Sequence, residues 1–313
     1  MNHRSVLFPL ILCISLTLAT PFLRGNASHP TEPASAETPP AEDAVLSPVL
    51  CAEGSAATEQ SSADHLQYLL VGLDRQEPSQ PARSDALILC SFCPHDNKLI
   101  LTSFLRDLYV EIPGHGSNRL NAAYAYGGRE LLVKTMEHNF GILPDGCIEV
   151  DFSHFAEIVD LLDGIDLNLR HDEADSVNAS TGAALTEGLQ HMAGAQALAY
   201  ARIRNLDADG DFSRTGRQQK VLSAIFRRCR EVSALRLLSV VIKAIPMIST
   251  DLDHKDLLST ASDLVPMLQD MTIEGQRIPA DKTYRFESVR GMDVIVADLD
   301  AARALLDESV INR

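Results

Sequence analysis

The order of apolar and polar positions predicts strands and helices that alternate along most of the chain. Four short runs rich in Leu, Ile, Val and aromatic residues are typical of buried strands, at 66–73, 85–92, 98–105 and 108–112. Residues 127–141 then place apolar side chains at helical spacing, and Gly141 is typical of a helix stop. The first half of the chain body therefore predicts strands followed by a helix.

The second half of the chain continues this alternation and then becomes mostly helical. We expect a strand at 147–152, a helix at 153–164 and a strand at 165–169. The later elements are expected as helices at 194–205, 214–231, 234–245, 255–271 and 298–310, with a strand pair around 284–286 and 293–296. The interleaving predicts one globular α/β domain over residues 64–313, with a central sheet flanked by helices.

The first 63 residues have a different pattern. Residues 5–23 carry no charge, and as a helix they would span about 28 Å, enough to cross the apolar part of a bilayer. Residues 1–24 are therefore either an uncleaved single-pass anchor or a signal peptide cleaved near Asn26 and Ala27. Residues 25–63, rich in Ala, Ser, Pro and Glu, predict a disordered tether. Either alternative exports the domain, which stays at the cell membrane or is secreted.

Composition narrows the function. The 313 residues are 45% hydrophobic, so the chain can bury a large core. Its 27 basic and 43 acidic residues give a net charge of −16. Proteins that bind nucleic acids neutralise phosphates with Lys and Arg, so this balance argues against a nucleic-acid partner.

A dense basic cluster nevertheless lies between two of the predicted helices. It consists of Arg202, Arg204, Arg214, Arg217 and Gln218. The first two residues end one helix and the others begin the next, so the tight connection turns the two sets toward each other. Converging guanidinium groups suit a phosphate or pyrophosphate. Ordinary ion pairs with the aspartates at 207, 209 and 211 fit the same spacing, and the residues alone leave both interpretations open.

Acidic and basic residues also occur together at the ends of three predicted strands. They are Asp74 with Arg75, Arg83 with Asp85, and Arg106 with Asp107. If these ends converge, the carboxylates suit a hard divalent cation and the guanidinium groups suit the phosphates that the cation bridges. The alternative is that these residues serve only the turns.

Other motifs argue for structure rather than chemistry. Cys90 and Cys93 form a C-x-x-C that closes a predicted strand, where residues three apart point to opposite faces. We therefore expect one small buried residue and one thiol at the strand end, and no zinc site. With Cys147 and Cys229 they would permit two disulfides outside the cytoplasm. The DADGD segment lacks the Gly and Glu of a calcium loop, having Phe212 and Gln218 at those places.

Long motifs in a fixed order resemble a known family. They are LLVGLDR (69–75), RSDALIL (83–89), SFLRDLYVEIPG (103–114), RLNAAYAYGGRELLVKTME (119–137) and ARIRNLDADGDFSRTGRQQKVL (201–222). Together they are similar to the LytR-CpsA-Psr family of bacterial envelope proteins, over roughly residues 66–224 and more weakly to 306. Leu105 stands where the family usually has Pro, and Ser213 where it has Gly.

The resemblance implies a fold of the α-β-α type and an enzyme that moves a glycopolymer, such as teichoic acid or capsule, from a polyprenyl-pyrophosphate carrier. The acceptor is peptidoglycan, typically the C6 hydroxyl of N-acetylmuramic acid, and polyprenyl phosphate is released. The implied cofactor is Mg²⁺, with Mn²⁺ as the alternative, and pyrophosphatase activity is an expected side reaction. The alternatives are a non-catalytic polyprenyl-phosphate binding protein and an envelope-linked regulator.

The resemblance also suggests roles for particular residues. Asp74 and Asp85 correspond to the metal-binding aspartates. Phosphate contacts are expected from Arg83, Arg106, Arg202, Arg204, Arg214 and Gln218, and Arg217 joins them by its place in the cluster. Arg106, Arg204 and Asp211 are the expected catalytic residues, and Asp107 or Asp211 is the candidate general base. The lipid should need an apolar cleft, expected under the helices at 120–140 and 155–163.

Overall fold

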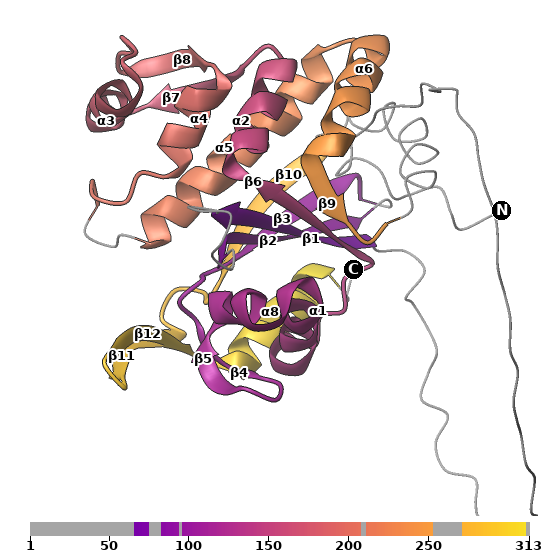
Figure 1. Ribbon diagram of the computed structural model, residues 1–313, viewed down its shortest axis with the longest axis vertical. Coiled ribbons are helices and arrows are strands. Elements are labelled where there is room, and N and C mark those ends of the chain that lie inside the picture. The colour runs from indigo at the N-terminus through magenta and orange to yellow at the C-terminus, as the bar shows by residue number, and fades with distance from the viewer. Residues whose placement is uncertain (1–65, 75–82, 94–95, 208–210, 253–270, 311–313) are drawn as a thin grey trace, which may run out of the picture. The chain divides into compact units, whose positions relative to one another are not determined.

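The centre of the domain is a six-stranded mixed sheet (Figure 1). The computed structural model describes residues 66–74, 83–93, 96–207, 211–252 and 271–310. The strand order is β10-β3-β2-β1-β6-β9. The strands are β1 (Leu66–Asp74), β2 (Arg83–Cys93), β3 (Lys98–Phe104), β6 (Gly146–Asp151), β9 (Ile248–Thr250) and β10 (Thr272–Ile278). β1 is antiparallel to β2 and parallel to β6, so the strands that carry the predicted site residues are direct neighbours.

Helices cover both faces of this sheet (Figure 1). One face carries α2 (Phe152–Leu161), α4 (Gly194–Ala201), α5 (Asp211–Glu231) and α6 (Ala234–Ala244), followed by the short 3₁₀ helix η2 (Ile245–Met247). Beyond them lie α3 (His171–Thr181) and the ribbon of β7 (Ile165–Leu169) and β8 (Gly188–Met192). The other face carries α1 (Leu120–Phe140) and α8 (Leu299–Val310). Two further ribbons are β4 (Tyr109–Ile112) with β5 (Gly116–Arg119), and β11 (Tyr284–Val289) with β12 (Met292–Ala297).

Alternating side chains divide the interior into two apolar cores. On β1, Tyr68 and Leu70 face the core under α2, α4 and α5, whereas Leu69 and Val71 face the core under α1 and α8. Successive residues of a strand point to opposite faces of its sheet, so an uninterrupted apolar run marks a strand buried on both sides. The α-β-α arrangement predicted from the sequence is therefore confirmed. Within the described ranges, no helix is both long and apolar enough to cross a bilayer.

Most predicted elements are present, and α1 shows an informative difference. It begins at Leu120 instead of residue 127, and it contains a break at Gly127 and Gly128. Gly128 adopts φ 61° and ψ −151°, a conformation that favours glycine. The prediction therefore captured only the part of the helix that follows the break.

Several elements were missed, and each lacks a clear apolar pattern. They are α3, β5, β8, β9 and β10. α3 reads HDEADSVNAST and buries few side chains, while β10 is an edge strand that includes a glycine and two charged residues. The predicted tether and membrane segment, and the helix expected at 255–271 except for Met271, lie outside the described residues.

The contact between α2 and α4 depends on a glycine. A Cβ atom on Gly194 would lie 1.9 Å from the carbonyl oxygen of Ala156, so the two backbones touch where the helices cross. The amide of Gly194 also donates a 2.7 Å hydrogen bond to Asp160 Oδ1. This crossing fixes the distance between the two helices.

We expect Gly194→Ala to lower the free energy of unfolding by about 3 kcal/mol, because α4 must move away from α2 to accommodate the methyl group. Gly216→Ala is the matched control, since a Cβ atom there meets nothing within 4 Å and the residue lies inside α5. That variant should gain about 1 kcal/mol from its higher helix propensity. Urea denaturation of both variants checks the pair, and equal stabilities would contradict the close crossing.

Candidate functional site

The carboxylate of Asp85 is the centre of the charged cluster. It is 8% exposed and accepts hydrogen bonds from Arg106 Nη1 at 2.7 Å and Arg204 Nη2 at 3.0 Å. Arg214, buried in the first turns of α5, directs Nη2 toward the carbonyl oxygen of Asp85 at 3.5 Å. Guanidinium groups from the segment after β3, the segment after α4 and the start of α5 therefore meet at one residue of β2.

A β-bulge explains why Asp85 can lie at the centre. Gly72 of β1 is opposite Ala86, but the next residue, Leu73, is opposite Ser84, so Asp85 is an extra residue in its strand. An extra residue interrupts the alternation of side chains and bends the strand locally. The bulge lets Asp85 reach the arginines, while Leu87 and Ile88 further along β2 point into the two cores.

The arginines keep Asp85 ionised although it is buried. Burial alone raises the pKa of this carboxyl group, but the positive charges of Arg106, Arg214 and Arg204 and the hydrogen bond from Arg106 outweigh that effect. The pKa of Asp85 is consequently held below its ordinary value. At neutral pH the cluster thus contains a fixed negative charge that orients the guanidinium groups.

A second pair lies at the end of the neighbouring strand. Arg202 Nη2 lies 3.8 Å from Asp74 Oδ2, and its guanidinium carbon lies 4.8 Å from the ring centre of Phe152. About half of the Arg202 side chain is exposed, so it is held by a ring and a carboxylate but still faces solvent. Asp74 and Asp85 belong to the adjacent strands β1 and β2.

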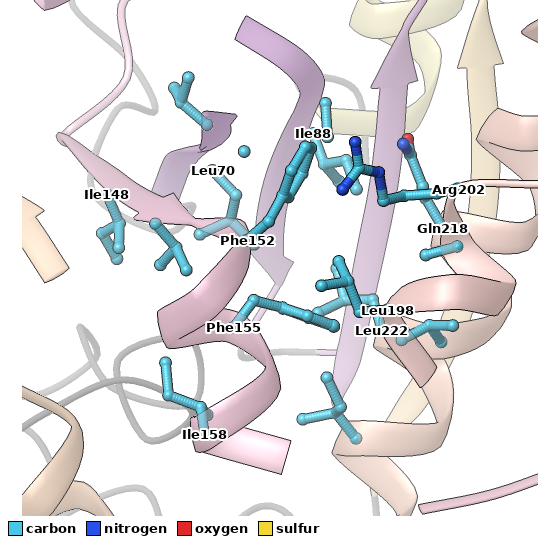
Figure 2. Close-up of a pocket in the computed structure, with 17 residues that line it drawn as sticks. Leu70, Ile88, Ile148, Phe152, Phe155, Ile158, Leu198, Arg202, Gln218 and Leu222 are labelled. Atoms are coloured by element: carbon cyan, nitrogen blue, oxygen red, sulfur yellow. The ribbon is translucent and has the colours of Figure 1, made fainter. Parts of the chain in front are cut away.

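An apolar pocket opens beside this cluster (Figure 2). It lies between the sheet and the helices α2, α4 and α5. Figure 2 shows Arg202 and Gln218 at one end and Ile158 at the other. The apolar lining includes Leu70, Ile88, Ile148, Phe152, Phe155, Ile158, Leu198 and Leu222. The pocket therefore combines a long apolar interior with a polar end next to the arginines.

Gly72 leaves space in the pocket on the side formed by the sheet. A Cβ atom on this residue would lie 2.9 Å from the Cβ of Ala86, on the strand beside it. Because both residues line the pocket, their small size leaves space that larger side chains would fill. The expectation of an apolar cleft is confirmed for residues 155–163 through Phe155 and Ile158. It is wrong for residues 120–140, because α1 packs on the opposite face of the sheet.

Arg217 has a different position from the other arginines. It is 3% exposed, and its Nε donates to Glu173 Oε1 of α3 at 2.9 Å. Its Nη1 lies 3.4 Å from the carbonyl oxygen of Ile203, and its Nη2 bonds to Asp207. All three guanidinium nitrogens contact the protein itself. In contrast to the sequence prediction, this geometry gives Arg217 a structural position between α5 and α3.

One neighbour of the cluster was not singled out from the sequence. Arg119 Nη1 donates to Asp107 Oδ1 at 3.2 Å, and Asp107 Oδ2 lies 3.4 Å from Arg106 Nε. Arg119 thus joins the cluster through Asp107. The sequence offered one indication, because Arg119 begins the RLNAAYAYGG motif. No apolar pattern, however, indicated that it lies beside a strand end.

For Arg83 and Asp211, two further predicted site residues, the structure gives the position of the backbone. Arg83 is opposite Asp74 in the ladder between β1 and β2, and Asp211 is the first residue of α5. The four cysteines of the domain are buried, and the described residues contain neither of the two disulfides considered from the sequence. Burial raises the pKa of the Cys90 thiol. Cys90 is a buried strand residue and Cys93 ends β2, as expected, and the Cys93 side chain is buried as well.

Comparisons with known proteins agree with this geometry. The model of the LytR_cpsA_psr family matches residues 35–308. TagU of Bacillus mycoides, a polyisoprenyl-teichoic acid–peptidoglycan teichoic acid transferase, is 32% identical over 223 residues, which cover 71% of each chain. The regulatory protein MsrR of Staphylococcus aureus is 35% identical over 162 residues, 51% of this chain and 48% of MsrR. The match thus spans about half the length of this staphylococcal relative.

A solved structure has the same fold. The LytR-CPS2A-psr family protein YwtF (TagT) with bound octaprenyl pyrophosphate superposes with a TM-score of 0.62 at 27% identity. The match covers 82% of this chain and 94% of that structure. The family model covers most of the chain and agrees with the relatives and the fold, so the protein belongs to the LytR-CpsA-Psr family.

Proposed function

We propose that this protein transfers a glycopolymer from a polyprenyl-pyrophosphate carrier to peptidoglycan. The observation that carries the proposal is the apolar pocket whose polar end adjoins the arginines around Asp85. A lipid pyrophosphate needs this combination, because its chain avoids water while its phosphates require positive charge. The bound octaprenyl pyrophosphate of the similar TagT structure and the name of the TagU relative support the same chemistry.

The charge of the site favours an anionic ligand although the whole chain is acidic. Arg106, Arg202, Arg204 and Arg214 bring four positive charges, and Asp74 and Asp85 bring two negative charges, which leaves an excess of two positive charges. About half of the side chains of Arg202 and Arg204 is exposed. These two arginines are therefore the ones that can turn toward an entering pyrophosphate.

In the proposed reaction, a hydroxyl of the acceptor attacks the phosphorus atom that carries the glycan. A new P–O bond forms to the acceptor, the P–O bond to the bridging oxygen breaks, and polyprenyl phosphate leaves. The guanidinium groups of Arg106 and Arg214, which are held at Asp85, stabilise the charge that accumulates on the phosphoryl oxygens, since they require no reorganisation during the reaction. The acceptor proton goes to a carboxylate, for which Asp107 and Asp211 are the candidates.

We propose Mg²⁺ as the cofactor, with Mn²⁺ as the alternative. Asp74 and Asp85 lie at adjacent strand ends, and two carboxylates suit Mg²⁺, which takes its other ligands from water and phosphates. When bound, the ion would supply further positive charge to the pyrophosphate. Among the described residues no group of three or more His, Cys, Asp or Glu side chains could hold a metal ion.

The membrane segment completes the proposal. Residues 5–23 would hold the domain at the outer side of the cell membrane, and the tether up to residue 63 would let it reach both the lipid carrier and the wall. Cleavage of the segment would release the same domain.

We expect Arg106→Ala to reduce transfer about 100- to 1000-fold, because it removes a guanidinium group aimed at the charge of the transition state. Asp85→Ala should have a similar effect, since Arg106 and Arg204 lose the carboxylate that orients them. The assay combines the full-length protein, Mg²⁺, a lipid-linked glycan and peptidoglycan. Arg285→Ala is the control, because this exposed arginine lies on β11 and pairs with Glu287.

Unchanged transfer in the Arg106 and Asp85 variants would contradict this site. If the wild-type protein binds polyprenyl pyrophosphate but transfers glycan to no acceptor, the protein is a non-catalytic binder. Thermal denaturation of each variant separates a loss of chemistry from a loss of fold.

Arg217 should behave as a structural residue. We expect Arg217→Ala to cost about 3–5 kcal/mol of stability, because it leaves the buried carboxylate of Glu173 without its partner. The double variant Arg217→Met with Glu173→Gln removes both charges and should recover much of that loss. Chemical denaturation measures the stabilities. Wild-type stability together with lost transfer would instead place Arg217 among the phosphate-binding residues.

A further inference from the structure

A polar groove lies on the side of α5 that faces away from the apolar pocket. Its side chains from α5 are Gln219, Lys220, Ser223 and Arg227, and Asn168 of β7 faces them. The apolar pocket takes Gln218, Val221, Leu222 and Ile225 from the same helix. These two sets alternate at helical spacing, so α5 separates two different cavities.

Two cations in this groove have no acidic partner within the described part of the chain. Lys220 and Arg227 are exposed, and no described carboxylate forms an ion pair with either of them. The neighbouring Arg217 and Arg228, in contrast, pair with Glu173 and Glu231. In a chain of net charge −16, two unpaired cations that line one groove favour an anionic ligand.

The spacing of the two cations limits the ligand. Lys220 and Arg227 are seven residues apart on one helix, which separates them by about 10 Å along its axis. A single phosphate is too small to reach both. A ligand that uses both needs two anionic groups about this far apart, and in an extended peptide two acidic groups three residues apart have that separation.

Gln219, which precedes Lys220 on α5, adds a hydrogen-bond acceptor to the groove. Its Nε2 lies 2.9 Å from Ser103 Oγ, 2.5 Å from the carbonyl oxygen of Gln276 and 3.3 Å from that of Leu101. These acceptors fix the orientation of the amide, and its Oε1 faces Gly275, where a Cβ atom would lie only 3.1 Å away. A fixed amide oxygen beside a glycine suits the N–H group of a peptide.

We propose that this groove binds a short acidic peptide through two carboxylates, namely the peptide part of the peptidoglycan acceptor. The proposal rests on the proposed transfer reaction, since only that reaction requires an acceptor. The proposed lipid site and Arg202 lie on the inner side of α5, so the groove is available to the second substrate. Gly216 lines its near end and is two residues from Arg214, so a peptide bound here would bring its sugar close to the phosphate cluster.

Direct binding tests the groove without reference to catalysis. We would titrate a fluorescent disaccharide–pentapeptide with free carboxylates into the full-length protein and into the variant Lys220→Gln with Arg227→Gln. We expect the variant to bind at least about tenfold more weakly, because the loss of even one charged contact costs about that factor. A peptide with amidated carboxylates should bind the wild-type protein as weakly as the variant binds the free acid.

The matched control is the double variant Lys134→Gln with Lys243→Gln. It removes two exposed lysine charges outside the groove, one on α1 and one on α6. It should bind the peptide like the wild-type protein. Equal binding by the groove variant, or by the amidated peptide, would overturn the proposal. A glycerol-phosphate oligomer is titrated in parallel, and if only its binding is lost in the groove variant, the groove serves the donor polymer and the proposal is also wrong.

Two further measurements separate this proposal from the transfer reaction itself. Binding of polyprenyl pyrophosphate should be the same in the groove variant and the wild-type protein, and in the transfer assay KM for the acceptor should rise about tenfold with kcat retained. If kcat falls and KM stays constant, the groove does not bind the acceptor. If neither the wild-type protein nor the variant transfers glycan but the peptide still binds through Lys220 and Arg227, the proposed transfer reaction is wrong and the groove is still a peptide-binding site.

Discussion

The buried carboxylate of Asp85 is the constraint on which the site depends. A charge removed from water is tolerated only if opposite charges and hydrogen bonds surround it, and here Arg106, Arg204 and Arg214 supply them. Each arginine comes from a different segment, so the cluster forms only when β2, β3, α4 and α5 are in place. The ion cluster therefore couples the fold of the domain to the arrangement of its proposed phosphate site.

The same cluster reconciles an acidic protein with an anionic substrate. Net charge describes the average field at a distance, whereas a ligand in the pocket experiences mainly the charges within a few ångströms. Around Asp85 the guanidinium groups outnumber the carboxylates, and the apolar walls of the pocket limit screening by water. The remaining acidic residues lie elsewhere, and many of them pair with arginines, as Glu173 does with Arg217.

The sequence was sufficient to predict those elements and residues that a local pattern of apolar or charged positions identifies. Apolar runs located the strands of the sheet except β9 and β10, and charged residues at their ends located Asp85 and Arg106. The ion pair of Arg217 with Glu173 was not predicted, because Glu173 lies on α3, a polar helix without an apolar stripe by which the sequence could identify it. The place of α1 was misjudged because a periodic pattern identifies a helix without saying which face of the sheet it covers.

The arrangement of α5 shows why one helix can separate two cavities. Its rotation is fixed at three levels, by Arg217 on Glu173, by Gln219 on Ser103 and Gln276, and by Arg230 on the carbonyl oxygen of Met271. These directional bonds add to the apolar packing of α5, and both would have to be broken for the helix to turn about its axis. The apolar face of α5 therefore stays in the apolar pocket, and the face with Lys220 and Arg227 stays in the polar groove. Ligands on the two sides of the helix can bind at the same time.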